Sequence, residues 1–450
     1  MLFCYHITDI LCVLFLWGCI MLSGLLTKYN ISIDIRKIIN NAGWLLFDKF
    51  ARLVFGLLVG VWVARYLGPA TYGDLAYVIT MISFFQVIAL LGMDSILVRD
   101  IANDRAKANE ILGSALVMRL CAGILCLLFV VMVSWLLNGY NTAIMTLLAG
   151  GSLIFQCADT IDIWFQSQSQ SKRTVISKLF SYTITNILRI VCILTNCPVW
   201  AFAVLLSVDA ALSSIALCFA YRTFKTQYTW KPVLHKCKTI LLESWPFLIS
   251  GLSITLYMRV DQILIKNLIG ESELGIYAAS LQFSTLWNFV PLTLSVSLAP
   301  YVARKKKEGG REYYNVLKRI FLLFSFIGWG ITVFVSALSP FIVEIMLGDK
   351  YLNGVGVLAI HVITNLFICL GVAQSLWIVN ERKGYLVIYK SLTGLVVCFA
   401  CNYLLIPVYG IKGAAISAVI AQFSACILFN AVFCREILVM QLKALVFIGR

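Results

Sequence analysis

Twelve long apolar runs restrict this chain to a helical fold within a membrane. A helix needs about 20 mostly apolar residues to cross a bilayer, and its backbone groups must be hydrogen-bonded internally because lipid offers no partners. No polar stretch between the runs is long enough for a separate soluble domain. The sequence therefore predicts an all-α integral membrane protein with twelve transmembrane helices, at approximately residues 41–67, 74–98, 110–137, 141–165, 174–196, 199–221, 243–268, 274–302, 313–340, 354–379, 384–406 and 412–434.

The charge distribution agrees with a membrane protein and predicts its orientation. Only 13% of the residues are charged, whereas soluble proteins carry about 25%. The net charge of +15 does not indicate nucleic-acid binding, because lysines and arginines concentrate in alternate connections, as the positive-inside rule expects for cytoplasmic loops. The opposite set of connections holds only Arg65, Lys266, Lys350 and Lys412. Both ends of the twelve-helix unit are therefore expected in the cytoplasm.

The chain offers no pattern for a cofactor, a metal ion or a catalytic group. Most of its 15 cysteines lie in apolar runs, where cysteine behaves as a small hydrophobic residue. Cys398 and Cys401 form a C-x-x-C motif without further ligands nearby, and His6, His235 and His361 are far apart in the sequence. We therefore expect neither a metal site nor an enzymatic site.

The twelve runs divide into two halves of six around the longest connection, which is basic. The motif [LI]-G-x4-G-x2-A follows the first run at Leu67 and recurs after the seventh run at Ile269. The equal numbers of runs and the shared motif predict a parallel repeat about an axis along the membrane normal. The predicted parts are a first half at 34–222, a basic cytoplasmic linker at 223–242, a second half at 243–435 and a cytoplasmic tail at 436–450.

Residues 1–33 precede this unit, and two interpretations fit them. The stretch from Ile10 to Leu26 is apolar, but it lacks a basic beginning and a small-residue cleavage site, so a cleaved signal peptide is not expected. The segment is either an extra hydrophobic helix or the result of a translation start assigned too far upstream. In the second case Met21 offers a later start.

The first predicted helix carries charges near its middle. A charge at that depth costs about 2.5–3.5 kcal/mol on insertion scales, so such residues normally face a water-filled cavity or a partner. Asp48 and Arg52 are four apart and can form a pair on one helix face, whereas Lys49 and Arg52 can point at the same target. Cationic groups inside a spanning helix indicate a pathway for an anion, and a purely structural pair is the alternative.

Further charges within the predicted helices are candidates for the same pathway. Arginine suits phosphate because its planar fork donates two hydrogen bonds at once. The candidate substrate-binding residues are Lys49, Arg52, Arg119, Arg189 and Arg259. The candidate ion-coupling carboxylates are Asp48, Asp162, Asp209 and Asp261. The structural alternatives are snorkelling of the long cations toward the interface and, for Asp162 with Asp159, an interfacial pair beside the following loop.

Four segments resemble a known family. VARYLGPATYGDLAYV, LGMDSILVRDIA, RVDQILIKNLIGESELGIYAAS and the P-x-x-G-x-x-G-A-A turn from Pro407 to Ala415 are similar to bacterial polysaccharide flippases. These are the O-antigen (Wzx-type) flippases of the multidrug/oligosaccharidyl-lipid/polysaccharide exporter superfamily. The resemblance covers about residues 36–435. The first half lacks an equivalent of the P-x-x-G-x-x-G-A-A turn, which weakens the repeat but not the resemblance.

This resemblance implies two six-helix lobes around a central cavity in the bacterial inner membrane. The implied cargo is an undecaprenyl-pyrophosphate-linked oligosaccharide repeat unit of O-antigen or a related surface polysaccharide. Alternating access would move it from the cytoplasmic to the periplasmic leaflet. Lys49 and Arg52 match the family's tendency to place cations in the lumen. The implied partners are this lipid-linked substrate, the bilayer, and the polymerase and chain-length regulator of the same pathway.

Other functions remain as alternatives. A cation-coupled drug exporter of the same superfamily would favour carboxylates in its lumen. A flippase for the lipid-linked peptidoglycan precursor usually has two further C-terminal helices, which are absent from this sequence. A membrane polysaccharide polymerase needs a sizeable periplasmic loop, and the predicted outer connections are short. A channel would need a selectivity filter, and no segment resembles one.

Overall fold

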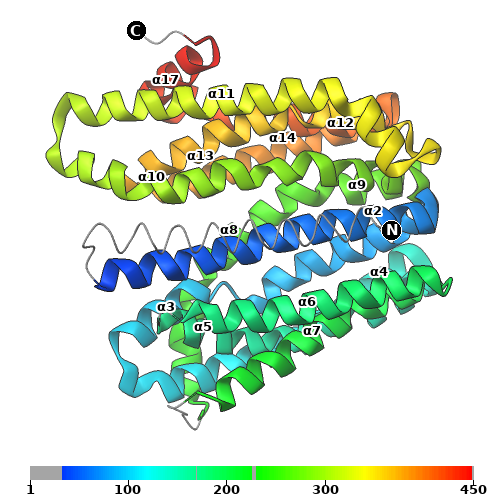
Figure 1. Ribbon diagram of the computed structural model, residues 1–450, viewed down its shortest axis with the longest axis horizontal. Helices are drawn as coiled ribbons and strands as arrows, with labels where there is room; N and C mark the ends of the chain where they lie inside the picture. Colours follow the sequence, from blue (N-terminus) through cyan, green and yellow to red (C-terminus); the bar gives the residue numbers. More distant parts are fainter. Residues whose placement is uncertain (1–32, 169, 225–229, 448–450) are drawn as a thin grey trace.

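The computed structural model describes residues 33–168, 170–224 and 230–447, and every regular element in that part is helical (Figure 1). The main helices are α2 (Ile33–Leu90), α3 (Asp94–Asn103), α4 (Ala108–Phe155), α5 (Asp159–Ser167), α6 (Ser171–Leu194), α7 (Val199–Arg222), α8 (Leu234–Ile269), α9 (Glu271–Thr285), α10 (Phe289–Glu308), α11 (Gly310–Ile342), α12 (Gly354–His361), α13 (Thr364–Asn380), α14 (Tyr385–Tyr409), α15 (Ile411–Phe423), α16 (Phe429–Phe433) and α17 (Arg435–Leu445). Short helical turns lie at Arg105–Lys107, Gln156–Ala158, Leu286–Asn288, Val343–Leu347, Asp349–Tyr351 and Ser424–Leu428.

Ten helical stretches among the described residues are long and apolar enough to cross a membrane, which confirms the prediction of an all-helical multi-pass protein. Two of them, Phe47–Asn103 and Ala108–Ser167, contain 57 and 60 residues. A straight helix of that length would reach about 85–90 Å, far more than a bilayer core of about 30 Å. Both stretches are interrupted by a glycine with positive φ, Gly68 (73°) and Gly139 (80°). Each is therefore two helical arms joined at a glycine.

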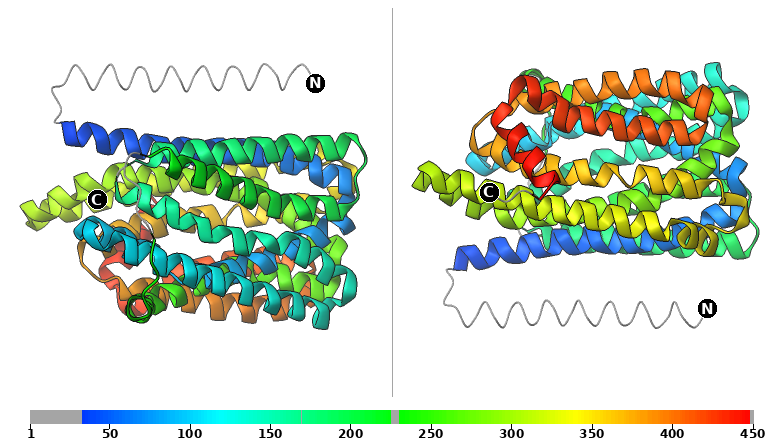
Figure 2. Two further views of the ribbon diagram at one scale, coloured as in Figure 1. Left: turned by 90° about the horizontal axis from the view of Figure 1, so that it is seen from below. Right: turned by 90° about the horizontal axis from the view of Figure 1, so that it is seen from above.

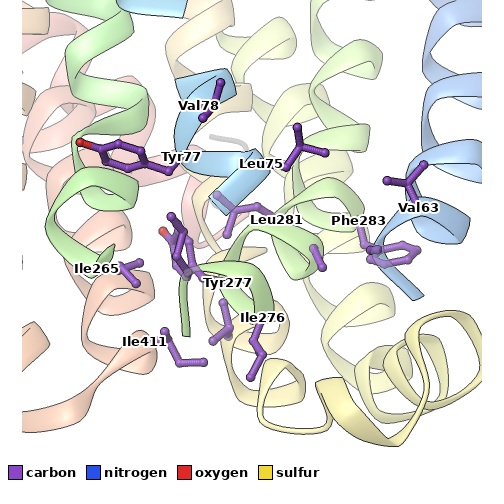
Figure 3. Packing of buried hydrophobic residues seen from close by; sticks show 14 of the residues in the cluster. Val63, Leu75, Tyr77, Val78, Ile265, Ile276, Tyr277, Leu281, Phe283 and Ile411 are labelled. Carbon is purple, nitrogen blue, oxygen red and sulfur yellow. The ribbon is translucent and has the colours of Figure 1, made fainter. Parts of the chain in front are cut away.

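The helices form two groups that lie side by side (Figures 1 and 2). In the N-terminal group, α2 packs against α4 and α6, and α7 packs against the same two helices. In the C-terminal group, α14 packs against α8 and α15, and α11 packs against α13. The groups meet where α2 packs along α9 and α8. One apolar core extends across this contact and includes Val63, Tyr77, Ile265, Tyr277 and Ile411 (Figure 3).

The two ends of the helix bundle differ in their turns. Five glycines with positive φ lie at one end, which we call the glycine end: Gly68, Gly139, Gly270, Gly348 and Gly410. Glycine suits these positions because it adopts positive φ without the strain that a Cβ would bring. At the opposite end, which we call the basic end, α10 and α11 extend past the other helices (Figure 2), and the last turn of α10 carries Lys305, Lys306 and Lys307.

Helices occur in two of the segments predicted outside the helical halves, and a third segment lies outside the described residues. The basic linker predicted at 223–242 is partly helical, because α8 already begins at Leu234. The tail predicted at 436–450 contains most of α17, which buries Ile437 and Ala444 and accepts a hydrogen bond at the Leu445 carbonyl from Trp329 Nε1 (3.2 Å). The predicted N-terminal extension falls on residues 1–32, outside the described part of the chain.

Candidate functional site

Two cavities of about 370 Å³ each lie between the helices, and Ile79 and Arg259 line both. The first, which we call the charged cavity, is lined by residues of α2, α4, α5, α6, α7 and α8. Its charged lining residues are Arg52, Asp159, Lys178, Asp209 and Arg259. The second, which we call the neutral cavity, is lined by α2, α8, α9 and the turn before α10, and Arg259 is the one charged residue among those described there.

Arg52 lies in the wall of the charged cavity and is also paired. Its Nε lies 2.8 Å from Asp48 Oδ1, the pair that the spacing of four residues predicts. The guanidinium lies over the ring of Tyr182, 4.9 Å from its centre, and the Tyr182 hydroxyl donates to the Arg52 carbonyl (3.0 Å). The structural pair and the cavity position therefore occur together, and α6 holds the Arg52 side chain in place.

Lys178 is a charged lining residue that the sequence analysis missed. Its Nζ lies 2.7 Å from Asp159 Oδ1 and 2.9 Å from Asp162 Oδ2, so the two carboxylates predicted to share a helix face also share this lysine of α6. Asp159 lines the charged cavity, whereas Asp162 lies behind it. Lys178 is near the start of the fifth apolar run, where a lysine can snorkel, and its position alone gave no signal.

Asp209 is a carboxylate of the charged cavity without a lysine or arginine partner in the described part of the chain. Its Oδ1 accepts hydrogen bonds from Ser181 Oγ (3.0 Å) and Thr185 Oγ1 (3.3 Å) of α6. These two hydroxyls hold the Asp209 carboxylate against α6 at the wall of the charged cavity.

Arg259 and Asp261 are two residues apart on α8 and point in different directions, as their spacing predicts. Arg259 faces both cavities and makes no ion pair with any described carboxylate. Asp261 is buried, and its oxygens accept hydrogen bonds from the Tyr277 hydroxyl and from the Gln262 backbone N–H (2.8 Å). Asp261 and His361 line a third cavity of about 60 Å³, where His361 Nδ1 lies 2.8 Å from Ser284 Oγ.

Three of the predicted cations are not among the described residues that line the two larger cavities, although Arg189 is close enough to act electrostatically on the lining residue Tyr72. Lys49 is exposed. Arg119 is fully buried and pairs with Asp94, while its Nε and Nη1 have no hydrogen-bond partner among the described residues. Arg189 donates to Asn186 Oδ1 (3.4 Å) one turn away on α6. The cavities thus bring together Arg52 and Arg259 but not the other three.

At the glycine end, the two helix groups touch through their backbones. A Cβ added to Gly73 would lie 1.8 Å from the Glu271 carbonyl oxygen, and a Cβ added to Gly275 would lie 1.9 Å from the Pro69 carbonyl oxygen. Gly73 and Gly275 occupy the same position of the repeated motif, as do Pro69 and Glu271. We call this reciprocal contact the glycine seal.

Polar contacts reinforce the glycine seal. Lys266 Nζ lies 2.7 Å from Asp74 Oδ1, and the Tyr351 hydroxyl donates to the Ala64 carbonyl (2.6 Å). Arg65 Nη1 donates to the Ile345 carbonyl (3.2 Å). All three contacts join the N-terminal group to the C-terminal group beside the glycine seal.

Curated relatives are similar to this chain over most of their length. It is 21% identical to the capsular polysaccharide biosynthesis protein CapF of Staphylococcus aureus, over 86% of this chain and 97% of CapF. It is 22% identical to a Shigella dysenteriae protein described as an O-antigen transporter, over 83% of this chain and 94% of that protein.

Solved structures show the same fold at low sequence identity. An inward-facing multidrug resistance transporter of the MATE family, in the MOP superfamily, matches with a TM-score of 0.71, 16% identity and coverage of 87% of this chain and 96% of that chain. The lipid II flippase MurJ, in an inward closed conformation, matches with a TM-score of 0.70, 13% identity and coverage of 89% and 90%. The family model described as "Polysaccharide biosynthesis protein" matches residues 38–305, more than half of the chain. The fold, the two relatives and this match agree, and the chain belongs to the polysaccharide biosynthesis protein family.

Proposed function

We propose that this protein is a flippase for an undecaprenyl-pyrophosphate-linked oligosaccharide repeat unit of O-antigen or a related surface polysaccharide. The observation that carries the proposal is the charged cavity, which takes Arg52 and Lys178 from the N-terminal group and Arg259 from the C-terminal group. A pyrophosphate diester carries negative charge and many acceptor oxygens, and arginine binds such groups through paired hydrogen bonds. A site lined from both groups can change shape when the groups move relative to each other.

The proposed topology has twelve transmembrane helices in two lobes. The ten candidate spans include two that are interrupted at Gly68 and Gly139, and counting each of these as two crossings gives twelve. The N-terminal and C-terminal groups are then the two lobes, the basic end lies in the cytoplasm and the glycine end in the periplasm of the inner membrane. In this orientation the glycine seal closes the periplasmic side.

Transport would proceed by alternating access. The substrate pyrophosphate would enter from the cytoplasmic leaflet and bind Arg52, Lys178 and Arg259, and rocking of the lobes would open the glycine seal. Lys49, Arg119 and Arg189 lie off the cavities and would meet the substrate only in another conformation. Among the proposed coupling carboxylates Asp48, Asp162, Asp209 and Asp261, Asp209 is the one that lines the charged cavity.

A drug exporter is the second candidate, because a MATE transporter shares the fold. The charges of the cavity favour an anionic cargo instead. Asp159 is paired with Lys178, and Asp209 is hydrogen-bonded by two hydroxyls, whereas Arg259 has no ion-pair partner among the described residues. The Shigella dysenteriae relative is described as a transporter, and the two solved structures are a transporter and a flippase, which agrees with a non-enzymatic role and disfavours a polymerase.

Complementation tests the proposal. A host that lacks its own flippase, but makes the matching lipid-linked repeat unit, would receive the wild type, Arg259→Ala or Arg259→Lys at equal membrane levels. We expect surface polysaccharide with the wild type, its loss with Arg259→Ala and partial recovery with Arg259→Lys. Arg304→Ala is the matched control, because Arg304 is an exposed arginine on α10 near the basic end. Failure of the wild type in a host with an intact sugar pathway would refute the proposed function.

A further inference from the structure

The neutral cavity differs from the charged cavity in chemistry. Its polar lining consists of side chains that are uncharged at neutral pH, apart from Arg259 at the boundary: Tyr72, Thr255, Gln262, Gln282, Thr285 and Asn288. Asp261 of α8 is not among its lining residues; this carboxylate accepts from the Tyr277 hydroxyl and lines the adjoining third cavity, which shares Thr285 and Asn288 with the neutral cavity. Amides and hydroxyls, rather than ions, therefore provide the hydrogen bonds available to a ligand there.

Asn288 provides the clearest sign of a missing ligand. It lies between the neutral cavity and the third cavity and lines both, and its Oδ1 is buried without a hydrogen-bond partner among the described residues. Buried polar atoms in native proteins are normally paired, and one that is not calls for an explanation such as a bound group. An amide oxygen accepts, so the group that would satisfy Asn288 is a donor such as a hydroxyl.

Neighbouring side chains are already engaged in ways that fix their orientation. Gln282 Nε2 donates to the Tyr72 hydroxyl, and Gln262 Oε1 accepts from Thr80 Oγ1 (2.5 Å). Thr285 Oγ1 donates to the Leu281 carbonyl (2.9 Å), which leaves its oxygen able to accept. The wall is thus a set of positioned acceptors and amides rather than a flexible surface.

The order of the two cavities along α2 determines how a molecule bound in both would be oriented. The neutral cavity touches Tyr72, Ala76 and Ile79, and the charged cavity touches Ile79, Ser83 and Gln86. The arm of α2 after Gly68 starts at the glycine end, so the neutral cavity lies between the charged cavity and the glycine seal. A molecule spanning both would point its uncharged part toward the seal.

We propose that the neutral cavity binds the sugars attached to the pyrophosphate, and that these sugars are uncharged. The inference rests on the proposed function, which places the pyrophosphate in the charged cavity. Sugar hydroxyls would donate to Asn288 and Thr285, and the volume of about 370 Å³ lies within the usual range of small-molecule pockets. A carboxylated sugar would place a negative charge against a wall whose one charged residue among those described, Arg259, already faces the pyrophosphate, and an unpaired buried charge is strongly disfavoured.

Direct binding of three synthetic lipids to the purified protein in nanodiscs tests this. The lipids are undecaprenyl pyrophosphate without sugar, the same lipid with neutral N-acetylhexosamines, and the same lipid with a hexuronic acid in place of one of these sugars. We expect the neutral lipid to bind about tenfold more tightly than the sugarless lipid, because the sugar hydroxyls form new hydrogen bonds with the cavity wall. The uronic acid lipid should bind no more tightly than the sugarless one.

Two variants in the neutral cavity test its role in binding the sugars. Asn288→Leu should remove the advantage of the neutral sugars and leave the affinity for the sugarless lipid within twofold of the wild type. Gln282→Arg should raise the affinity for the uronic acid lipid by supplying a cation. Asn267→Leu, at an exposed position of α8, is the matched control for Asn288→Leu. Size-exclusion profiles confirm that each variant is folded.

The results distinguish failure of this inference from failure of the proposed function. If the sugarless lipid binds and Arg52→Ala weakens that binding, but neutral and uronic acid lipids bind the wild type equally, the assignment of the neutral cavity is wrong. If Asn288→Leu lowered the affinities for the sugarless lipid and for the neutral lipid equally, this assignment would also be wrong. If no lipid binds in a way that depends on Arg52, the proposed function itself fails.

Discussion

The glycine seal makes a sharp prediction about Gly73→Ala. The added Cβ would lie 1.8 Å from the Glu271 carbonyl oxygen, whereas ordinary contact begins at 3.4 Å. The obstacle is backbone on α9, so a side-chain rotation cannot relieve the clash, and the two helix groups must separate by about 1.6 Å at this point. Overpacking of this kind costs about 1–3 kcal/mol. A bias of that size shifts a two-state equilibrium by about 5–150-fold.

The expected result is a population shift toward the conformation open at the glycine end, with loss of complementation. A reporter cysteine at Thr285 in the neutral cavity, in a background without other reactive cysteines, would be labelled by a membrane-impermeant maleimide applied to the periplasmic side. Labelling should rise by at least fivefold in Gly73→Ala and in Gly275→Ala. Gly330→Ala is the matched control, because no other atom lies within 4 Å of its added Cβ.

Unchanged labelling in both glycine variants, at wild-type expression, would refute the argument that this contact closes the periplasmic side. Increased labelling from the cytoplasmic side alone would instead show that the orientation is inverted. The two glycines lie in equivalent positions, so an effect of one without the other would contradict the reciprocal contact.

Two cations that form ion pairs, Lys178 and Arg119, give further predictions. Lys178→Met should lower the melting temperature in detergent, since it leaves Asp159 and Asp162 facing each other without their shared cation, and adding Asp159→Asn should restore part of the loss. Differential scanning fluorimetry measures both variants, and an unchanged melting temperature in Lys178→Met would contradict the role of the lysine. Asp94→Ala should destabilise by about 3–5 kcal/mol because it leaves Arg119 buried and unpaired, whereas Arg119→Met should be close to neutral, since Asp94 stays 61% exposed. Equal losses in unfolding experiments on these two variants would contradict this asymmetry.

The sequence alone predicted the features that depend on the spacing of residues along one helix. Apolar length predicted the helices, and the spacing of four predicted the pair between Asp48 and Arg52. The repeated glycine motif predicted equivalence of Gly73 and Gly275, but only the structure brings them into contact. Contact between helices far apart in the chain depends on packing, which spacing does not encode.

The site was harder to predict because depth in the membrane does not determine which neighbour a residue faces. Arg119 and Arg259 both lie within apolar runs, yet one pairs with Asp94 and the other faces two cavities. Lys178 was not predicted as a cavity residue because a lysine near the start of an apolar run can snorkel to the membrane interface. Asn288 was not predicted as a site residue because a neutral amide does not interrupt an apolar run. Its unpaired Oδ1 becomes apparent only when the surrounding residues are known.

The reciprocal contact of the glycine seal has the form of an isologous dimer interface within one chain. In such an interface residue i contacts j, and the copy of i contacts the copy of j, around a two-fold axis. Gly73 meets Glu271 as Gly275 meets Pro69, and each pair occupies matching positions of the motif. The same geometry would let two separate six-helix units, each with one copy of the motif, pair through this surface as a two-fold dimer.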